Sequence, residues 1–231
     1  MRETKMGTTA EPIIRHHLED EMLMLYAAGR LSEGWSVAVA THLALCPSCR
    51  GRVGVYEAIG GHFLDNEEPI EDDDAVAESW SRLKSRIENE EFPNVVTLRR
   101  PAGDRLLPQP LRSYVDRAGG LKWKTLGTGG AAQMIVPTED KSTTVRLLRI
   151  PAGLPVPEHT HRGDELTLVL AGSFSDQFAT FRRGDVEMAD PDVLHTPRAG
   201  HGQDCICLAV TDAPLKFSSR LLRLLQPLLG I

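Results

Sequence analysis

The histidines and cysteines of this chain fall into two groups that lie far apart in the sequence. The 231 residues include eight His and four Cys. One group lies within residues 16–49 and the other within residues 159–207, and only His62 lies outside both. Each group has spacings typical of metal ligands. Because a chain of this length can form two small domains, we expect two domains with one site each.

The first group has the order His42-x3-Cys46-x2-Cys49. On a helix, side chains four residues apart leave the same face, so His42 and Cys46 lie one turn apart. A Cys-x2-Cys pair is a common half of a tetrahedral zinc site, and zinc needs a fourth ligand. The candidates for that ligand are His16, His17 and His62. A thioredoxin-like redox pair is the alternative, but no strand precedes Cys-Pro-Ser-Cys as it does in that fold.

The hydrophobic pattern changes along the chain from helical to extended. Helical spacing dominates residues 13–63 and returns at 75–87, after a stretch (67–74) with six carboxylates in eight positions. Residues 93–110 hold four prolines and predict a flexible linker. Short strands separated by turn residues are expected over 143–150, 165–170 and 205–210. The apolar tail, 215–225, is expected to pack on the barrel or to form a dimer contact. The pattern predicts an α+β protein with a helical N-terminal domain and an antiparallel β-barrel or sandwich.

Charge is distributed unevenly over the two halves. The formal net charge is −6; residues 1–100 hold 11 basic and 18 acidic side chains, a net of −7, and the remainder has a net of +1. Neither half is basic enough to bind nucleic acid by neutralising phosphates, and the acidic half favours a protein partner with a basic face. The sequence has no run of 18 apolar residues and no signal-peptide pattern, so we expect a cytoplasmic protein without a membrane span.

The N-terminal half contains three further segments of note: Ile14-Arg-His-His17, Tyr26-Ala-Ala-Gly-Arg-Leu-Ser-Glu33 and Ala40-Thr-His-Leu-Ala-Leu-Cys-Pro-Ser-Cys49. Together they resemble the zinc-binding anti-sigma domain of ChrR-type anti-sigma factors. The resemblance implies a structural Zn2+ held by His17, His42, Cys46 and Cys49. It also implies that the helical domain binds an extracytoplasmic-function sigma factor and keeps it from RNA polymerase.

The second group begins with His159-x-His161-x3-Glu165. Side chains two apart on a strand share a face, so both imidazoles can point to one place, and a turn at 163–164 lets Glu165 point back toward them. The run Gly153-x5-His159-x-His161-x3-Glu165-x6-Gly172 resembles the first cupin motif at every defined position. The second motif is weaker, with Asp190, Asp192 and Ala199 at its usual Pro, Gly and Asn positions, and it supplies His195. The implied ligands are His159, His161, Glu165 and His195, for Zn2+ or another divalent transition metal.

The resemblance extends over nearly the whole chain, because Arg162–Gly172 and Asp204–Ala209 also resemble ChrR-type proteins. We therefore expect residues 12–92 to form the zinc-binding anti-sigma domain, 93–110 a linker, and 111–231 a cupin sensor. The implied function is inhibition of an extracytoplasmic-function sigma factor, with release when the cupin senses oxidative or small-molecule stress.

Two other classes of protein are compatible with parts of the pattern. A metal-dependent cupin enzyme, of dioxygenase or isomerase type, is the main alternative, although no general acid or base is evident beside the ligands. A DNA-binding zinc-finger regulator is disfavoured by the −7 balance of the first 100 residues. Cys205 and Cys207, two apart on an expected strand, are interpreted as buried packing residues, with a redox-active pair as the alternative.

Overall fold

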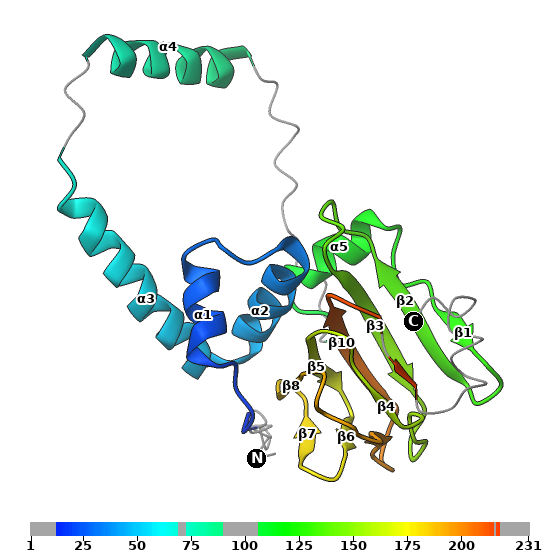
Figure 1. Cartoon of the computed structure of the whole chain (residues 1–231). Coiled ribbons are helices and arrows are strands. Elements are labelled where there is room, and N and C mark those ends of the chain that lie inside the picture. The colour runs from blue at the N-terminus through cyan, green and yellow to red at the C-terminus, as the bar shows by residue number, and fades with distance from the viewer. Residues whose placement is uncertain (1–12, 69–72, 90–105, 215, 218–231) are drawn as a thin grey trace, which may run out of the picture. The chain divides into compact units, whose positions relative to one another are not determined.

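A computed structural model describes residues 13–68, 73–89, 106–214 and 216–217 (Figure 1). The helices are α1 (Asp20–Ala27), α2 (Glu33–Leu45), α3 (Pro47–Asp65), α4 (Asp73–Asn89) and α5 (Leu111–Arg117). The strands are β1 (Lys124–Leu126), β2 (Ala131–Val136), β3 (Thr144–Ile150), β4 (His159–Thr160), β5 (Glu165–Ala171), β6 (Ser173–Ser175), β7 (Thr180–Arg182), β8 (Val186–Ala189), β9 (Arg198–Ala199), β10 (Cys205–Thr211) and β11 (Lys216–Phe217). The predicted α+β class is confirmed.

Local sequence accounts for the ends of the N-terminal helices. α1 ends at Ala27, and Gly29 follows with a φ of 65°, a conformation that glycine adopts without steric cost. Ser32 is the N-cap residue of α2 in extended conformation, although its side chain makes no capping hydrogen bond. α3 begins at Pro47, which suits the first helical position because the N–H that proline lacks would be unbonded there.

All the strands pair antiparallel. The largest sheet has the order β1-β2-β3-β10-β5-β8, and smaller sheets have the orders β7-β6-β9 and β11-β4. The predicted strands 143–150, 165–170 and 205–210 correspond to β3, β5 and β10, which are neighbours in the large sheet. Six of the seven residues of β5 are buried, among them the polar Glu165 and Thr167, so both faces of this strand are covered.

Helix α2 covers one face of the large sheet, where it contacts β5 and β10 (Figure 1). Its side chains Val37, Ala38 and Val39 are at most 3% exposed, and they belong to one hydrophobic core with Leu168 of β5 and Leu208 of β10. A second, smaller cluster lies inside the barrel. The N-terminal helices are therefore joined to the cupin-like sheets by a shared core.

The chain divides by its contacts into two compact units, Met1–Glu57 with Arg105–Ile231, and Ala58–Asp104. These units differ from the expected boundaries at residues 92 and 111, because α1, α2 and the start of α3 belong with the sheets. The predicted linker lies mostly outside the described residues, but its end is packed, with Leu107 4% exposed. The expected division into domains remains a prediction.

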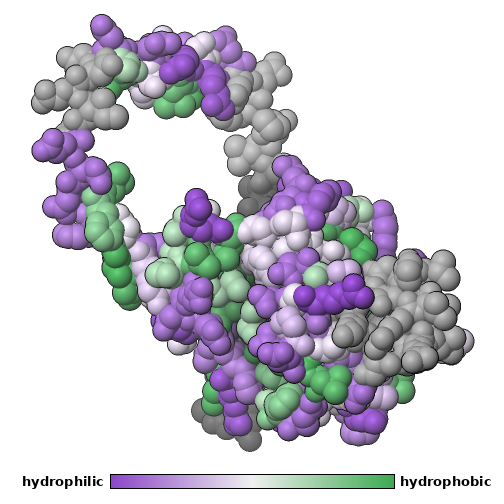
Figure 2. Space-filling model, viewed as in Figure 1, coloured by the Kyte–Doolittle hydropathy of each residue, from purple (hydrophilic) through white to green (hydrophobic). Residues whose placement is uncertain are grey.

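The second unit contains the end of α3 and all of α4. Every described side chain of α4 from residue 74 onward is exposed. Figure 2 shows hydrophobic residues at the surface of both helices. The large apolar side chains exposed there are Ile59, Phe63, Leu64, Val76, Trp80, Leu83 and Ile87. The predicted helix at 75–87 is confirmed, and its apolar side has no buried contact among the described residues. The tail 215–225 lies almost wholly outside the described residues.

Candidate metal centres

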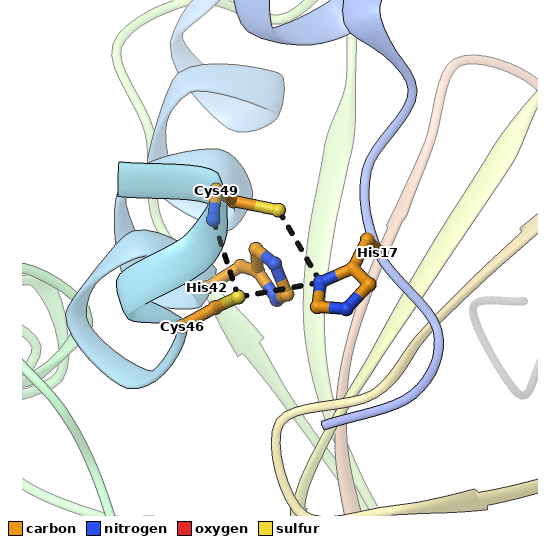
Figure 3. A group of neighbouring side chains, drawn as sticks. All are labelled: His17, His42, Cys46 and Cys49. Carbon is orange, nitrogen blue, oxygen red and sulfur yellow. Dashed lines mark hydrogen bonds between the residues drawn. The ribbon is translucent and has the colours of Figure 1, made fainter. Parts of the chain in front are cut away.

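The four predicted N-terminal ligands lie together (Figure 3). His17 precedes α1, His42 lies in the last turn of α2, and Cys46 and Cys49 flank the start of α3. One ligand atom from each residue lies within 4.8 Å of the others, and His17 Nδ1 is 3.3 Å from Cys46 Sγ and 3.5 Å from Cys49 Sγ. Three separate segments thus meet at one point.

The other candidates for the fourth ligand lie elsewhere. The His16 ring packs against Phe181 of β7, with ring centroids 4.6 Å apart. His62 lies on the exposed end of α3, where Asn66 donates a hydrogen bond to its carbonyl oxygen. Ligation by His17 remains a prediction, and among the three candidates His17 is the one that lies beside His42, Cys46 and Cys49.

His42 is oriented by a residue from the barrel. Its Nδ1 lies 2.9 Å from the carbonyl oxygen of Gly184, so Nδ1 carries the proton and donates it. The lone pair of Nε2 is then free, and this atom is buried with no hydrogen-bond partner among the described residues. Burial lowers the pKa of His42 to about 4, which keeps the ring neutral. A buried, neutral, unpartnered imidazole nitrogen facing thiols is the donor that zinc requires.

The two cysteines complete this donor set. Cys46 and Cys49 are at most 1% exposed, and the Cys49 backbone N–H donates to Cys46 Sγ at 3.4 Å. Burial raises the pKa of the Cys49 thiol to about 11. Arg52 donates to Cys49 Sγ at 3.8 Å and to the Leu18 carbonyl at 3.0 Å, which places a positive charge beside the thiols. Two sulfurs and two imidazoles fit a tetrahedral zinc ion, which would stabilise both thiolates.

Residues 15 and 16, just before His17, are held by the turn between β7 and β8. Asp185 Oδ1 accepts hydrogen bonds from the backbone N–H groups of Arg15, at 2.7 Å, and His16, at 3.0 Å. Sequence analysis missed Gly184, Asp185 and Arg52. For the first two, no local signal exists, because they lie more than 140 residues from the ligands that they support.

In the barrel, three of the four predicted ligands converge. His195 Nε2 lies 3.2 Å from His159 Nε2 and 3.3 Å from His161 Nε2, and all three side chains are buried. Backbone hydrogen bonds in both directions between His159 and His195, at 3.2 and 3.1 Å, bring together residues 36 positions apart. Three converging Nε2 atoms suit a divalent transition metal with an open coordination position.

Glu165 is placed differently from the expectation. Its Oε2 lies 3.5 Å from Nδ1 of His161, on the side of that ring away from the converging nitrogens, and its Oε1 accepts a hydrogen bond from Thr167 at 2.9 Å. Burial opposes ionisation of Glu165, but its interaction with the neighbouring His161 outweighs burial and lowers the pKa of the carboxyl. In this arrangement the carboxylate orients a histidine, and direct ligation by Glu165 remains a prediction.

Two further carboxylates beside His195 were missed by sequence analysis. Glu187 Oε1 lies 3.3 Å and Asp176 Oδ2 3.4 Å from His195 Nδ1. Burial opposes protonation of His195, but these carboxylates, Glu187 foremost, raise its pKa. Burial raises the pKa of Glu187. Carboxylate contacts to the outer nitrogen of a ligand histidine are typical of metal sites, but no motif marks these two residues in the sequence.

A cavity of about 80 Å³ is lined by two of the three histidines, His159 and His195. Its polar end is formed by His159, His195, Glu165, Glu187 and Arg146, and its apolar wall includes Leu148, Ile150, Val156, Phe174, Pro197 and Ala199. Cys205 and Cys207 also line it, with sulfurs 3.4 Å apart and no disulfide. The hydrogen bond between the two thiols, together with burial, raises the pKa of Cys207. Both thiols belong to the small interior cluster, as the packing interpretation predicts.

Comparison with known proteins places this chain in a family. A family model of the ChrR cupin-like domain matches residues 113–214. The chain is 46% identical over 224 residues to the anti-sigma-E factor ChrR of Cereibacter sphaeroides, an alignment that covers 94% of this chain and 99% of that protein. It also matches the crystal structure of Rhodobacter sphaeroides SigE in complex with the anti-sigma ChrR, with a TM-score of 0.70, 44% identity, and coverage of 86% of this chain and 99% of that one. Among the described residues, no helix is long and apolar enough to cross a membrane. The chain belongs to the family of the anti-sigma factor ChrR.

Proposed function

We propose that this chain is a zinc-dependent anti-sigma factor that binds an extracytoplasmic-function sigma factor in the cytoplasm. The observation that carries the proposal is the 46% identity to an anti-sigma-E factor, which extends over 94% of the chain and so includes both histidine clusters. The matched crystal structure holds that relative in complex with SigE. This agreement favours a regulator over the metal-dependent enzyme that a cupin fold alone would also allow.

Exposed apolar side chains on α3 and α4 provide the surface for such a partner. On α4, Val76, Trp80, Leu83 and Ile87 follow each other at steps of four, three and four residues, and each is 46–62% exposed. This spacing forms one stripe along the helix, as in helices that dock into an apolar groove. The acidic residues just before the stripe would meet basic groups of the sigma factor and favour correct encounter.

Zinc would hold this N-terminal region together. His17, His42, Cys46 and Cys49 come from three segments, so a bound ion would join the start of the chain to α2 and α3. In small helical units, the free energy of zinc binding contributes directly to folding. Loss of a ligand would disorder the base from which α3 extends.

The cupin cluster would hold a second divalent metal and respond to the signal. His159, His161 and His195 would be its ligands, with Glu165 as a further ligand or as the orienting partner of His161. The adjoining cavity, which two buried thiols also line, would hold a small molecule or oxidant beside the metal. The signal would release the sigma factor if it favoured the conformation that binds the sigma factor less tightly.

Co-purification tests the proposal. The full chain is co-expressed with extracytoplasmic-function sigma factors of its source, and the complex is assayed for both proteins and for zinc per chain. Cys49→Ser should lose one zinc and the sigma factor, whereas Cys205→Ser, a buried thiol outside the N-terminal cluster, should keep both. The proposal fails if the wild-type chain retains none of these sigma factors, or if Cys49→Ser binds one as tightly as wild type does.

A further inference from the structure

The turn between β7 and β8 contacts both segments that carry the histidines of the N-terminal cluster. The Gly184 carbonyl accepts the Nδ1 hydrogen of His42 at 2.9 Å. Asp185 Oδ1 accepts the backbone N–H groups of Arg15 and His16, and the Val186 N–H donates to the His16 carbonyl at 3.2 Å. One short turn of the barrel therefore sets the position of two proposed ligands that are 25 residues apart in the sequence.

The turn is firmly held within the barrel. Asp185 is 1% exposed, its Oδ2 accepts the Arg182 N–H at 2.8 Å, and its own N–H donates to the Arg182 carbonyl at 2.8 Å. Backbone hydrogen bonds also join Val169 of β5 to Gly184 and Asp185, at 2.9 and 3.1 Å. The carbonyl that His42 meets is thus held in place by hydrogen bonds within the barrel.

Glycine at position 184 favours this contact. Its φ is 91°, and a Cβ at this position would lie 2.6 Å from the Cδ1 atom of Ile14, three residues before His17. Without a side chain, the backbone of the turn can approach the N-terminal segment closely enough for the hydrogen bonds to Asp185.

We infer that the β7–β8 turn is the outer shell of the N-terminal metal site, with Asp185 as a positioning residue. The inference rests on the proposed zinc site. Outer-shell partners of ligand histidines fix the ring and its tautomer, and their mutation typically lowers metal affinity by about 10- to 100-fold. Affinity at the helical site therefore depends on a residue of the cupin fold, although the four ligands all lie in the first 49 residues.

Cobalt binding by the full-length protein tests the role of Asp185. Co2+ bound by Cys46 and Cys49 gives a thiolate-to-metal absorption band, which the histidine cluster of the barrel does not give, and Zn2+ displaces Co2+ because it binds more tightly. In Asp185→Asn the amide has a single acceptor oxygen for N–H groups that now reach both carboxylate oxygens. We expect Zn2+ and Co2+ affinity at this site to fall by at least about 10-fold.

Two matched variants separate the outcomes. Asp204→Asn changes another barrel aspartate that accepts a backbone N–H, from Ala152 at 3.2 Å, and should leave the affinity unchanged. Arg15→Pro removes one N–H that Asp185 accepts without altering the barrel, so it should weaken binding even if Asp185→Asn does not fold. Wild-type affinity in Arg15→Pro, or in folded Asp185→Asn, would overturn the inference. Absence of the thiolate band from the wild-type protein would instead refute the proposed zinc site.

Discussion

Replacement of Gly34 by alanine tests whether α2 packs on the barrel as described. In an exposed helix, Gly→Ala stabilises by about 0.5–1 kcal/mol, because glycine loses more backbone entropy on folding. At Gly34 the added Cβ would lie 2.2 Å from Oγ1 of Thr143 and 2.9 Å from Cγ2 of Val145 on β3. Overpacking of this kind costs about 1–3 kcal/mol, so we expect a net loss of about 1–2 kcal/mol.

Thermal unfolding of the zinc-saturated protein, followed by circular dichroism, measures this change. For a chain of this size a loss of about 1–2 kcal/mol lowers Tm by about 2–8 °C. Gly54→Ala on α3 is the matched control, because a Cβ added there would have no atom within 4 Å, and it should raise Tm slightly.

A compensating change identifies the contact. Thr143→Ala removes the closest atom, a buried hydroxyl oxygen with no hydrogen-bond partner among the described residues, so its loss costs little by itself. The double variant Gly34→Ala/Thr143→Ala should recover part of the lost Tm. If Gly34→Ala stabilised the protein as Gly54→Ala does, the packing of α2 against β3 would be refuted.

The described contacts also predict responses to pH, to truncation of a side chain on α4, and to a thiol reagent. In zinc-free protein, burial lowers the pKa of His42 to about 4 from an ordinary 6.5, so between these two pH values the unfolded chain binds more protons than the folded chain does. Denaturant titrations should therefore show that this group lowers the free energy of unfolding by about 3 kcal/mol as the pH drops from 7 to 4. A free energy of unfolding that does not change with pH would contradict this prediction. Trp80→Ala should weaken sigma-factor binding at least about 30-fold without changing Tm, whereas Phe178→Ala, at a similarly exposed position on the barrel, should bind as wild type does. If Trp80→Ala bound the sigma factor as tightly as wild type, α4 would not be part of the interface. Mass spectrometry should show that Cys205 and Cys207 react with iodoacetamide far more slowly in the folded protein than after unfolding. Both thiols are buried, and the pKa of Cys207 is raised by its hydrogen bond with Cys205. Rapid labelling of the folded protein would instead show that the cavity opens.

Short-range spacing made the elements and most of the proposed ligands predictable from the sequence. His42 and Cys46 lie one helical turn apart, and His159 and His161 lie close on the chain, so local geometry alone brings each pair together. Gly29 and Pro47 mark where α1 ends and α3 begins, for reasons that act within a few residues. The change of period from helix to strand predicted the fold class in the same way.

The tertiary structure decided what depends on contacts between distant segments. It placed Glu165 at the outer nitrogen of His161, brought Glu187 and Asp176 to His195, and joined α2 to the sheet through a common core. The clearest case is Asp185, whose carboxylate binds the backbone of Arg15 across 170 positions. Periodicity and spacing report only on neighbours along one helix or strand, whereas these contacts arise where separately formed elements pack. The sequence alone therefore predicted two ligand sets in two domains, and the packing showed that the barrel supports both.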